Sequence, residues 1–167
     1  MSEAQRNERP LERLVSVRTM RLVTYGSGDS FCKELFVPIK NRQHTKPEGG
    51  LWASPVGCAF GWKEWCASQS WGDLTSKFEM VYGGHTLVID SLRDLSSFIW
   101  QEDSYDFGYP DYEAMMRIGI DGIYLTERGL AETRFSQPGL HGYDCECVLV
   151  MNPECVRAAN VKVRGPL

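Results

Sequence analysis

The stretch KPEGGLWASP, residues 46–55, decides the fold that the sequence predicts. Gly49 and Gly50 permit backbone angles that other residues avoid, and the three apolar residues after them predict a short buried strand. Ser54 can cap a helix and Pro55 can occupy its first turn. The sequence therefore predicts a strand that runs directly into a helix, beside a crevice lined by glycine.

The predicted helix is rich in aromatic residues. The side chains that share one face at helical spacing are Cys58, Trp62, Trp65, Cys66 and Gln69. Trp71 lies just beyond the expected end of the helix. We expect the aromatic face to pack on the preceding strand, so that the junction can hold a flat ring.

The other apolar segments predict more short strands than helices. Strands are expected at residues 21–25, 51–53, 78–82, 86–89, 122–126, 145–151 and 156–163, with a glycine-containing hairpin turn at residues 83–85. Further helices are expected at residues 92–99 and 110–118, and a loop at residues 40–48 that can act as a lid. Few strands alternate strictly with helices, so the fold class is α+β with a curved, mainly antiparallel sheet and two or three short helices.

Length and charge narrow the class of protein. The chain has 167 residues, a length that suits one domain at residues 11–167, preceded by a loose arm at residues 1–10. Its net charge of −4 argues against a general nucleic-acid binder. No apolar run approaches the roughly 18 residues of a membrane span, and the N-terminus lacks an apolar signal region. We expect a cytoplasmic monomer, in the producing or a host cell, without membrane contact.

The six cysteines predict free, mostly buried thiols, because no secretory signal accompanies them. Cys145 and Cys147 are spaced to face one side of a strand, but the histidines are scattered and no pair of cysteines has two-residue spacing. We therefore predict no metal site. A cysteine nucleophile with a histidine base stays open as an alternative, drawn from Cys58 or Cys66 with His85 or His141.

Three segments together resemble the ADP-ribosyltransferase fold, in the branch that includes diphtheria-toxin-like and poly(ADP-ribose) polymerase-like domains. Residues 22–27, LVTYGS, are similar to the family's opening strand, with Tyr25 where the family usually has histidine. Residues 50–54, GLWAS, are similar to its glycine-hydrophobic-aromatic strand. Residues 143–153, YDCECVLVMNP, look like its late strand, in which a glutamate precedes an apolar run that ends in Asp/Asn-Pro.

The resemblance implies a split sheet, NAD as substrate and a set of site residues. The glutamate that stabilises the charge left when nicotinamide departs corresponds to Glu146, with Asp144 on the same face as the reserve. An aromatic side chain would stack on nicotinamide, and basic groups would hold the pyrophosphate. The residues expected to bind NAD are Arg21, Tyr25, Gly26, Lys46, Gly50, Trp52, Trp62 and Trp65.

The predicted function is that of a small NAD-dependent mono-ADP-ribosyltransferase or NAD-cleaving effector. Its acceptor would be a macromolecule, a protein rather than a nucleic acid. The alternative is a non-catalytic interaction or inhibitor protein on the same scaffold, which binds a partner through an acidic and aromatic surface. That surface would include Tyr105, Phe107, Tyr109 and Tyr112. A domain whose pockets are empty is the third possibility.

Overall fold

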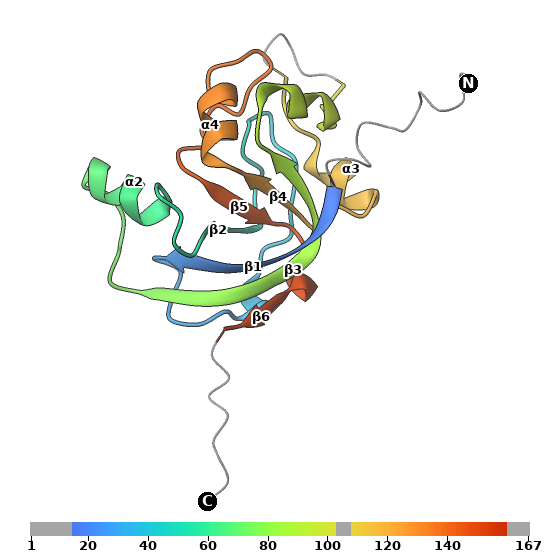
Figure 1. Cartoon of the computed structure of the whole chain (residues 1–167). Coiled ribbons are helices and arrows are strands. Elements are labelled where there is room, and N and C mark those ends of the chain that lie inside the picture. The colour runs from blue at the N-terminus through green and yellow to red at the C-terminus, as the bar shows by residue number, and fades with distance from the viewer. Residues whose placement is uncertain (1–14, 103–107, 160–167) are drawn as a thin grey trace, which may run out of the picture.

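The computed structural model of the chain describes residues 15–102 and 108–159, and its strands form one sheet that closes into a small barrel (Figure 1). The strands are β1 (Val15–Tyr25), β2 (Leu51–Pro55), β3 (Lys77–Ile89), β4 (Gly122–Leu125), β5 (Cys147–Val150) and β6 (Val156–Ala158). The order is β1-β2-β5-β4-β3, and β3 also pairs with β1, while β6 lies on β3. Only the β3–β4 pair is parallel, so the prediction of a mainly antiparallel α+β fold is confirmed.

The predicted split in the sheet is wrong, because β3 is long enough to pair with two barrel strands. It pairs with β1 from Lys77 to Leu87 and with β4 from Thr86 to Ile89. A strand that has neighbours on both edges leaves no gap in the sheet. The five strands therefore form a closed ring.

The predicted hairpin turn at residues 83–85 is also wrong, since β3 runs straight through it. Neither Gly83 nor Gly84 has a positive φ. A Cβ on Gly84 would lie 2.8 Å from the Cβ of Asp121 and 2.9 Å from the hydroxyl oxygen of Tyr82. Glycine is used here for close packing rather than for a turn.

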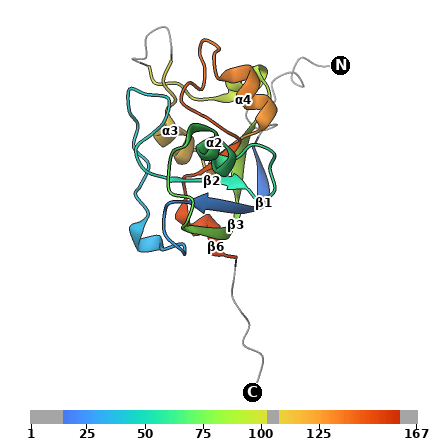
Figure 2. The same ribbon diagram turned by 90° about the vertical axis from the view of Figure 1, so that its left-hand side faces the viewer.

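The helices are short and lie on different sides of the barrel. The α-helices are α2 (Trp62–Gln69), α3 (Tyr112–Arg117) and α4 (Glu127–Thr133), and the 3-10 helices are Lys33–Leu35, Leu92–Ser97 and Pro153–Cys155. Figures 1 and 2 show α2 on a side of the barrel away from α4. Helix α4 was not predicted, although the hydroxyl of Thr126 caps it by accepting from the amide of Gly129.

The predicted junction of strand and helix is displaced. β2 continues to Pro55, and α2 begins only at Trp62 with Gly61 as its cap. Ser54 still serves the helix, because its hydroxyl oxygen accepts the amide hydrogen of Trp62 at 2.8 Å. The strand therefore ends in a turn, and one serine reaches across it to the start of the helix.

The sheet separates two apolar clusters, one on each face. The interior cluster fills the barrel and contains Leu22, Ala53, Phe78, Met80, Tyr82, Val148, Val150 and Val156. The outer cluster lies between the sheet and the helices, and its strand residues are Leu87, Ile89, Ile123, Leu125, Cys147 and Leu149. Successive β5 residues alternate between the two clusters, as the two-residue period of a strand requires.

The loop at residues 40–48, predicted as a lid, is held by several hydrogen bonds. Lys40 and Glu48 pair through their backbones, and the side-chain amide of Asn41 donates to Asp111 at 2.7 Å. The backbone oxygen of Thr45 accepts from the buried hydroxyl of Tyr112. These contacts fix the loop on the outer cluster.

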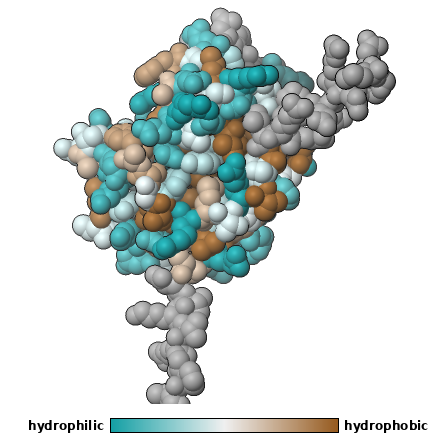
Figure 3. Space-filling model, viewed as in Figure 1, coloured by the Kyte–Doolittle hydropathy of each residue, from teal (hydrophilic) through white to brown (hydrophobic). Residues whose placement is uncertain are grey.

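Some predictions fall outside the described residues. They include the arm at residues 1–10, the end of the last predicted strand after Ala159, and Tyr105 and Phe107 of the proposed acidic and aromatic surface. Tyr112 is fully buried, so it does not belong to such a surface. On the face drawn in Figure 3, hydrophobic residues lie in small groups among hydrophilic ones.

Candidate functional site

A cleft opens where β1 separates from β2. The two strands pair only at Leu22 with Pro55 and at Val23 with Ser54. The next residues along each strand line the cleft, namely Thr24 and Tyr25 on β1 and Ala53 and Trp52 on β2. Its volume is about 210 Å³. The cleft therefore begins at the point where the backbone pairing ends.

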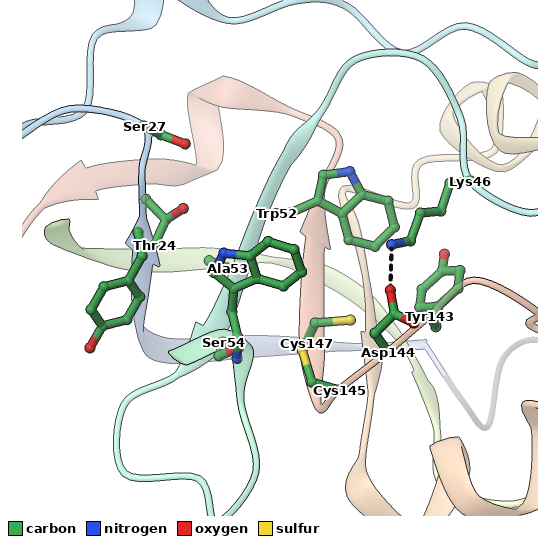
Figure 4. Close-up of a pocket in the computed structure, with 12 residues that line it drawn as sticks. Thr24, Ser27, Lys46, Trp52, Ala53, Ser54, Tyr143, Asp144, Cys145 and Cys147 are labelled. Atoms are coloured by element: carbon green, nitrogen blue, oxygen red, sulfur yellow. Dashed lines mark hydrogen bonds and ion pairs between the residues drawn. The ribbon is translucent and has the colours of Figure 1, made fainter. Parts of the chain in front are cut away.

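Ser54 of β2 and four other parts of the chain complete the lining of the cleft. These parts contribute Ser27 from the turn after β1, Lys46 from the loop at residues 40–48 (the anchored loop), Trp62 from the first turn of α2, and Tyr143, Asp144, Cys145 and Cys147 from the start of β5 and the segment before it. Figure 4 shows these side chains around the cleft. All three segments that resemble the transferase family thus contribute to one cleft.

Asp144 is the carboxylate of the cleft, and two cations hold it. Its Oδ2 lies 3.4 Å from Lys46 Nζ, and its Oδ1 lies 3.0 Å from Arg134 Nη2. The Asp144 side chain is only 20% exposed, so these pairs are less screened than surface pairs. The two cations outnumber the single carboxylate and give this side of the cleft a net positive charge.

Trp52 forms an aromatic wall of the cleft. Lys46 Nζ lies 5.3 Å from the Trp52 ring centroid, within the range of a cation–π contact. The Tyr143 ring meets Trp52 edge-on at 5.1 Å, and the Tyr143 hydroxyl is 2.9 Å from that of Tyr112. These contacts hold the Trp52 ring in a defined position.

Trp62 lies in the cleft, and the other predicted tryptophan stands behind it. Trp65 stacks on Trp62 at 5.0 Å, and Trp71 meets both rings edge-on. Trp65 is not among the residues that line the cleft. The stack instead supports Trp62 from outside.

Glu146 does not reach the cleft. Its carboxylate accepts a hydrogen bond from the Tyr124 hydroxyl. Tyr124 pairs with Val148 across the β4–β5 ladder and packs against the interior cluster, whereas Trp52 packs against the outer one. The carboxylate of Glu146 is thus directed to the other face of the sheet, and the prediction that Glu146 shares a face with Asp144 is wrong.

The remaining predicted site residues lie beside the cleft rather than in it. Arg21 forms an ion pair with Glu79 at 2.6 Å. The amide of Gly26 donates to the backbone oxygen of Ser76. A Cβ on Gly50 would lie 2.7 Å from side-chain atoms of Ile39 and Leu149, so Gly50 is needed for packing. None of these three residues lines the cleft.

The cysteine–histidine alternative has no support in the structure. Burial raises the pKa of the Cys58 thiol to about 11 and also raises that of Cys66, which disfavours a nucleophilic thiolate at either. The His85 ring lies 3.4 Å from Asp121, and His141 Nε2 hydrogen-bonds to the backbone oxygen of Ser136. Neither contact joins a histidine to these thiols.

All six cysteines are free thiols, and two of them line the cleft. Cys32 is exposed, contrary to the expectation of burial. Cys145 and Cys147 were predicted to face one side of a strand, but neither was predicted to belong to the site. Arg134 was missed as well, because it caps the end of α4, a helix that was not predicted.

The chain matches no protein-family model, no curated protein and no solved structure. Within residues 15–102 and 108–159, no cluster of three or more His, Cys, Asp or Glu side chains is arranged to hold a metal ion. Across the same residues, no helix has the length and apolar character needed to cross a bilayer. The geometry of the cleft is therefore the basis on which a function can be proposed.

Proposed function

We propose that the cleft binds the nicotinamide end of NAD and that the protein is a small NAD-dependent mono-ADP-ribosyltransferase or NAD-cleaving effector. The observation that supports this proposal is the meeting of Tyr25, Trp52 and Asp144 around one cleft. The active carboxylate in this proposal is Asp144, since Glu146 is hydrogen-bonded to Tyr124 on the other face of the sheet.

The size of the cleft suits one ring better than a whole dinucleotide. Its volume of about 210 Å³ is below the range of roughly 300–1,000 Å³ in which drug-sized ligands are usually buried. The rest of the substrate would lie over the rim, beside Lys46 and Arg134. Both side chains are partly exposed, so they can also contact phosphate oxygens.

The reaction would begin with loss of nicotinamide from the ribose. The positively charged ring would stack on Trp52 or Trp62, a contact worth about 0.5–2 kcal/mol when water is excluded. As the glycosidic bond breaks, the electron pair leaves with nicotinamide and positive charge develops on the ribose. A fixed carboxylate at Asp144 stabilises that charge. The acceptor, proposed to be a protein, would then attack the same carbon.

Lys46 and Arg134 would keep the Asp144 carboxylate oriented during this step. The two ion pairs, one at each carboxylate oxygen, restrict its rotation. The same pairs would also lower the electron density that Asp144 can offer. We therefore expect a slow enzyme, whose rate depends on both partners of Asp144.

A comparison of two neighbouring carboxylates tests the proposal. Wild type, Asp144→Asn and Glu146→Gln are incubated with NAD and a cell lysate, and nicotinamide release and transfer of labelled ADP-ribose are measured. We expect the rate of nicotinamide release by Asp144→Asn to be at least about 100-fold lower than that of wild type. This is in the range found when one electrostatic group is removed from an active site. Glu146→Gln should retain the rate within about threefold, because its side chain is remote from the reacting atoms.

The result that rejects the proposal is the absence of nicotinamide release from wild type. A larger loss in Glu146→Gln than in Asp144→Asn would reject the assignment of the carboxylate. A thermal shift with NAD separates binding from catalysis, because a ligand at tenfold its dissociation constant stabilises a protein by about 1.4 kcal/mol. Capture of a partner without any effect of NAD would favour the non-catalytic interaction protein.

A further inference from the structure

Two thiols form part of the lining of the cleft. Cys145 is 3% exposed and Cys147 is 6% exposed, and both residues line the cleft. Figure 4 shows them next to one another, near Asp144. A reagent can therefore approach them only by entering the cleft. No step of the proposed transfer reaction uses either thiol.

Cys145 and Cys147 share one hydrogen bond, and that bond makes them unequal. The thiol of Cys147 donates to the sulfur of Cys145, which lowers the pKa of Cys145 against the opposing effect of burial. The positive charge of Lys46 lowers it further. The pKa of Cys147 is raised well above its usual value by the same hydrogen bond and by burial. Cys145 is thus the thiol of the pair that ionises more readily.

The titratable groups around Cys145 come from three elements. Asp144 and Cys147 belong to its own segment, Lys46 to the anchored loop, and Cys58 and Cys66 to the turn and helix on the other side. Asp144 opposes ionisation of Cys145, but its charge is shared by two ion pairs. A cation beside a thiol and a donor on its sulfur are the usual surroundings of a reactive cysteine.

The other cysteines lack these surroundings. Burial raises the pKa values of Cys58 and Cys155 to about 11 and also raises that of Cys66. Cys32 is exposed and is open to any reagent in solution. Cys145 is therefore distinguished by a hydrogen-bond donor and a cation beside its sulfur, at a position that lines a small cleft.

We propose that Cys145 is a modification site for small disulfides, which enter the cleft between β1 and β2 and form a mixed disulfide with it. The cleft of about 210 Å³ selects compact reagents over large ones. The adduct would occupy the space between Trp52 and Asp144. If the cleft also binds NAD, as proposed above, modification and NAD binding exclude one another.

The step is a thiol–disulfide exchange. The Cys145 thiolate attacks one sulfur of the reagent, the reagent's S–S bond breaks, and a new S–S bond joins that sulfur to Cys145 Sγ. The departing thiolate takes up a proton from water, which replaces the proton that Cys145 released. The disulfide is itself the oxidant, so no further reactant is needed. Burial still raises the pKa of Cys147 after Cys145 is modified, which slows attack of Cys147 on the mixed disulfide.

The experiment uses the full chain with Cys32→Ser as the reference protein, so that the exposed thiol does not contribute. The neutral reagent bis(2-hydroxyethyl) disulfide is added near neutral pH, and modified peptides are followed in time by mass spectrometry. We expect Cys145 to react at least about tenfold faster than Cys58, Cys66 or Cys155, since one pKa unit changes the thiolate fraction about tenfold. Glutathione disulfide, a larger reagent, should react more slowly with Cys145.

Three variants separate a tuned thiol from a merely accessible one. Cys147→Ala removes the donor and should slow modification of Cys145, whereas Cys147→Ser keeps a donor and should preserve the rate. Lys46→Met should shift the pH midpoint of the reaction upward, because loss of a positive charge raises the pKa of Cys145. Nicotinamide release, assayed separately, is not required for any of these results.

Either of two outcomes overturns the proposal. One is modification of Cys58, Cys66 or Cys155 before Cys145 in the folded reference protein. The other is an equal rate in the Cys147→Ala and Cys147→Ser variants. Circular dichroism checks that each variant is folded, and the order of modification in the reference protein decides the question even if a variant is not. Protection of Cys145 by NAD would additionally link the thiol to the proposed function.

Discussion

The two faces of β5 differ in what they can do. Val148 and Val150 point into the barrel and are fully buried in an apolar cluster. Cys147 points to the opposite face, where it and the preceding Asp144 line a cleft with charged and aromatic side chains. Substitution of Val148 or Val150 should therefore change stability, and substitution of Cys147 or Asp144 should change binding and reactivity. Leu149 shares the face of Cys147 but is fully buried in the outer cluster, so the division concerns the residues that line the cleft and not the whole face.

The strongest test of this division is truncation inside the barrel. Met80 is fully buried in the interior cluster, and we expect Met80→Ala to cost about 2–5 kcal/mol of unfolding free energy through lost burial and the cavity left behind. Urea denaturation measures the loss. Ser27→Ala, at the exposed rim of the cleft, is the control and should change stability by less than about 0.5 kcal/mol. Equal losses of unfolding free energy in Met80→Ala and Ser27→Ala would contradict this difference between the barrel interior and the cleft.

A smaller effect should distinguish Trp52, which lines the cleft, from Trp65, which does not. Trp52→Leu removes the ring that lines the cleft and should weaken binding of the 1-methylnicotinamide cation by about 0.5–2 kcal/mol, the worth of a cation–π contact. Trp65→Leu should leave binding nearly unchanged, because Trp65 lies behind Trp62. Isothermal titration calorimetry measures both affinities. An equal loss in Trp65→Leu would mean that the ligand lies on the tryptophan stack instead.

The smallest effect is expected at Arg21, which is outside the cleft. Its pair with Glu79 is largely exposed, so Arg21→Ala should cost only about 0.2–1 kcal/mol of stability. Affinity for 1-methylnicotinamide should stay the same. Thermal denaturation and the same titration provide the two measurements. Weaker ligand binding in Arg21→Ala would extend the site along β1.

Sequence patterns predicted the class of the fold and part of the cleft. The glycine pair before Trp52 and the apolar run after Asp144 each mark a strand, and those strands pair in the structure. Composition and periodicity do not record which strand closes a ring. The long pairing of β3 depends on contacts between residues far apart in the chain, so the barrel was not predicted.

The role of Glu146 was not predictable for a related reason. Which of two nearby carboxylates faces the cleft depends on the backbone path just before β5. There the amide of Glu146 donates to the backbone oxygen of Phe60, and the backbone oxygen of Glu146 accepts from the hydroxyl of Ser54. Those bonds turn its side chain toward Tyr124. A pattern of residue types cannot specify such a turn. The hairpin turn predicted at Gly83 and Gly84 was wrong for a similar reason, because close packing and a tight turn both favour glycine.

The short ladder between β1 and β2 has a consequence for how a ligand enters. Only two residue pairs join these strands, whereas β1 and β3 are paired along eleven residues. The barrel is thus closed by extensive backbone pairing on one edge of β1 and by short pairing on the other. A ligand that enters beside Tyr25 has few backbone hydrogen bonds between β1 and β2 to break. The barrel can therefore open between these two strands while its interior cluster stays packed.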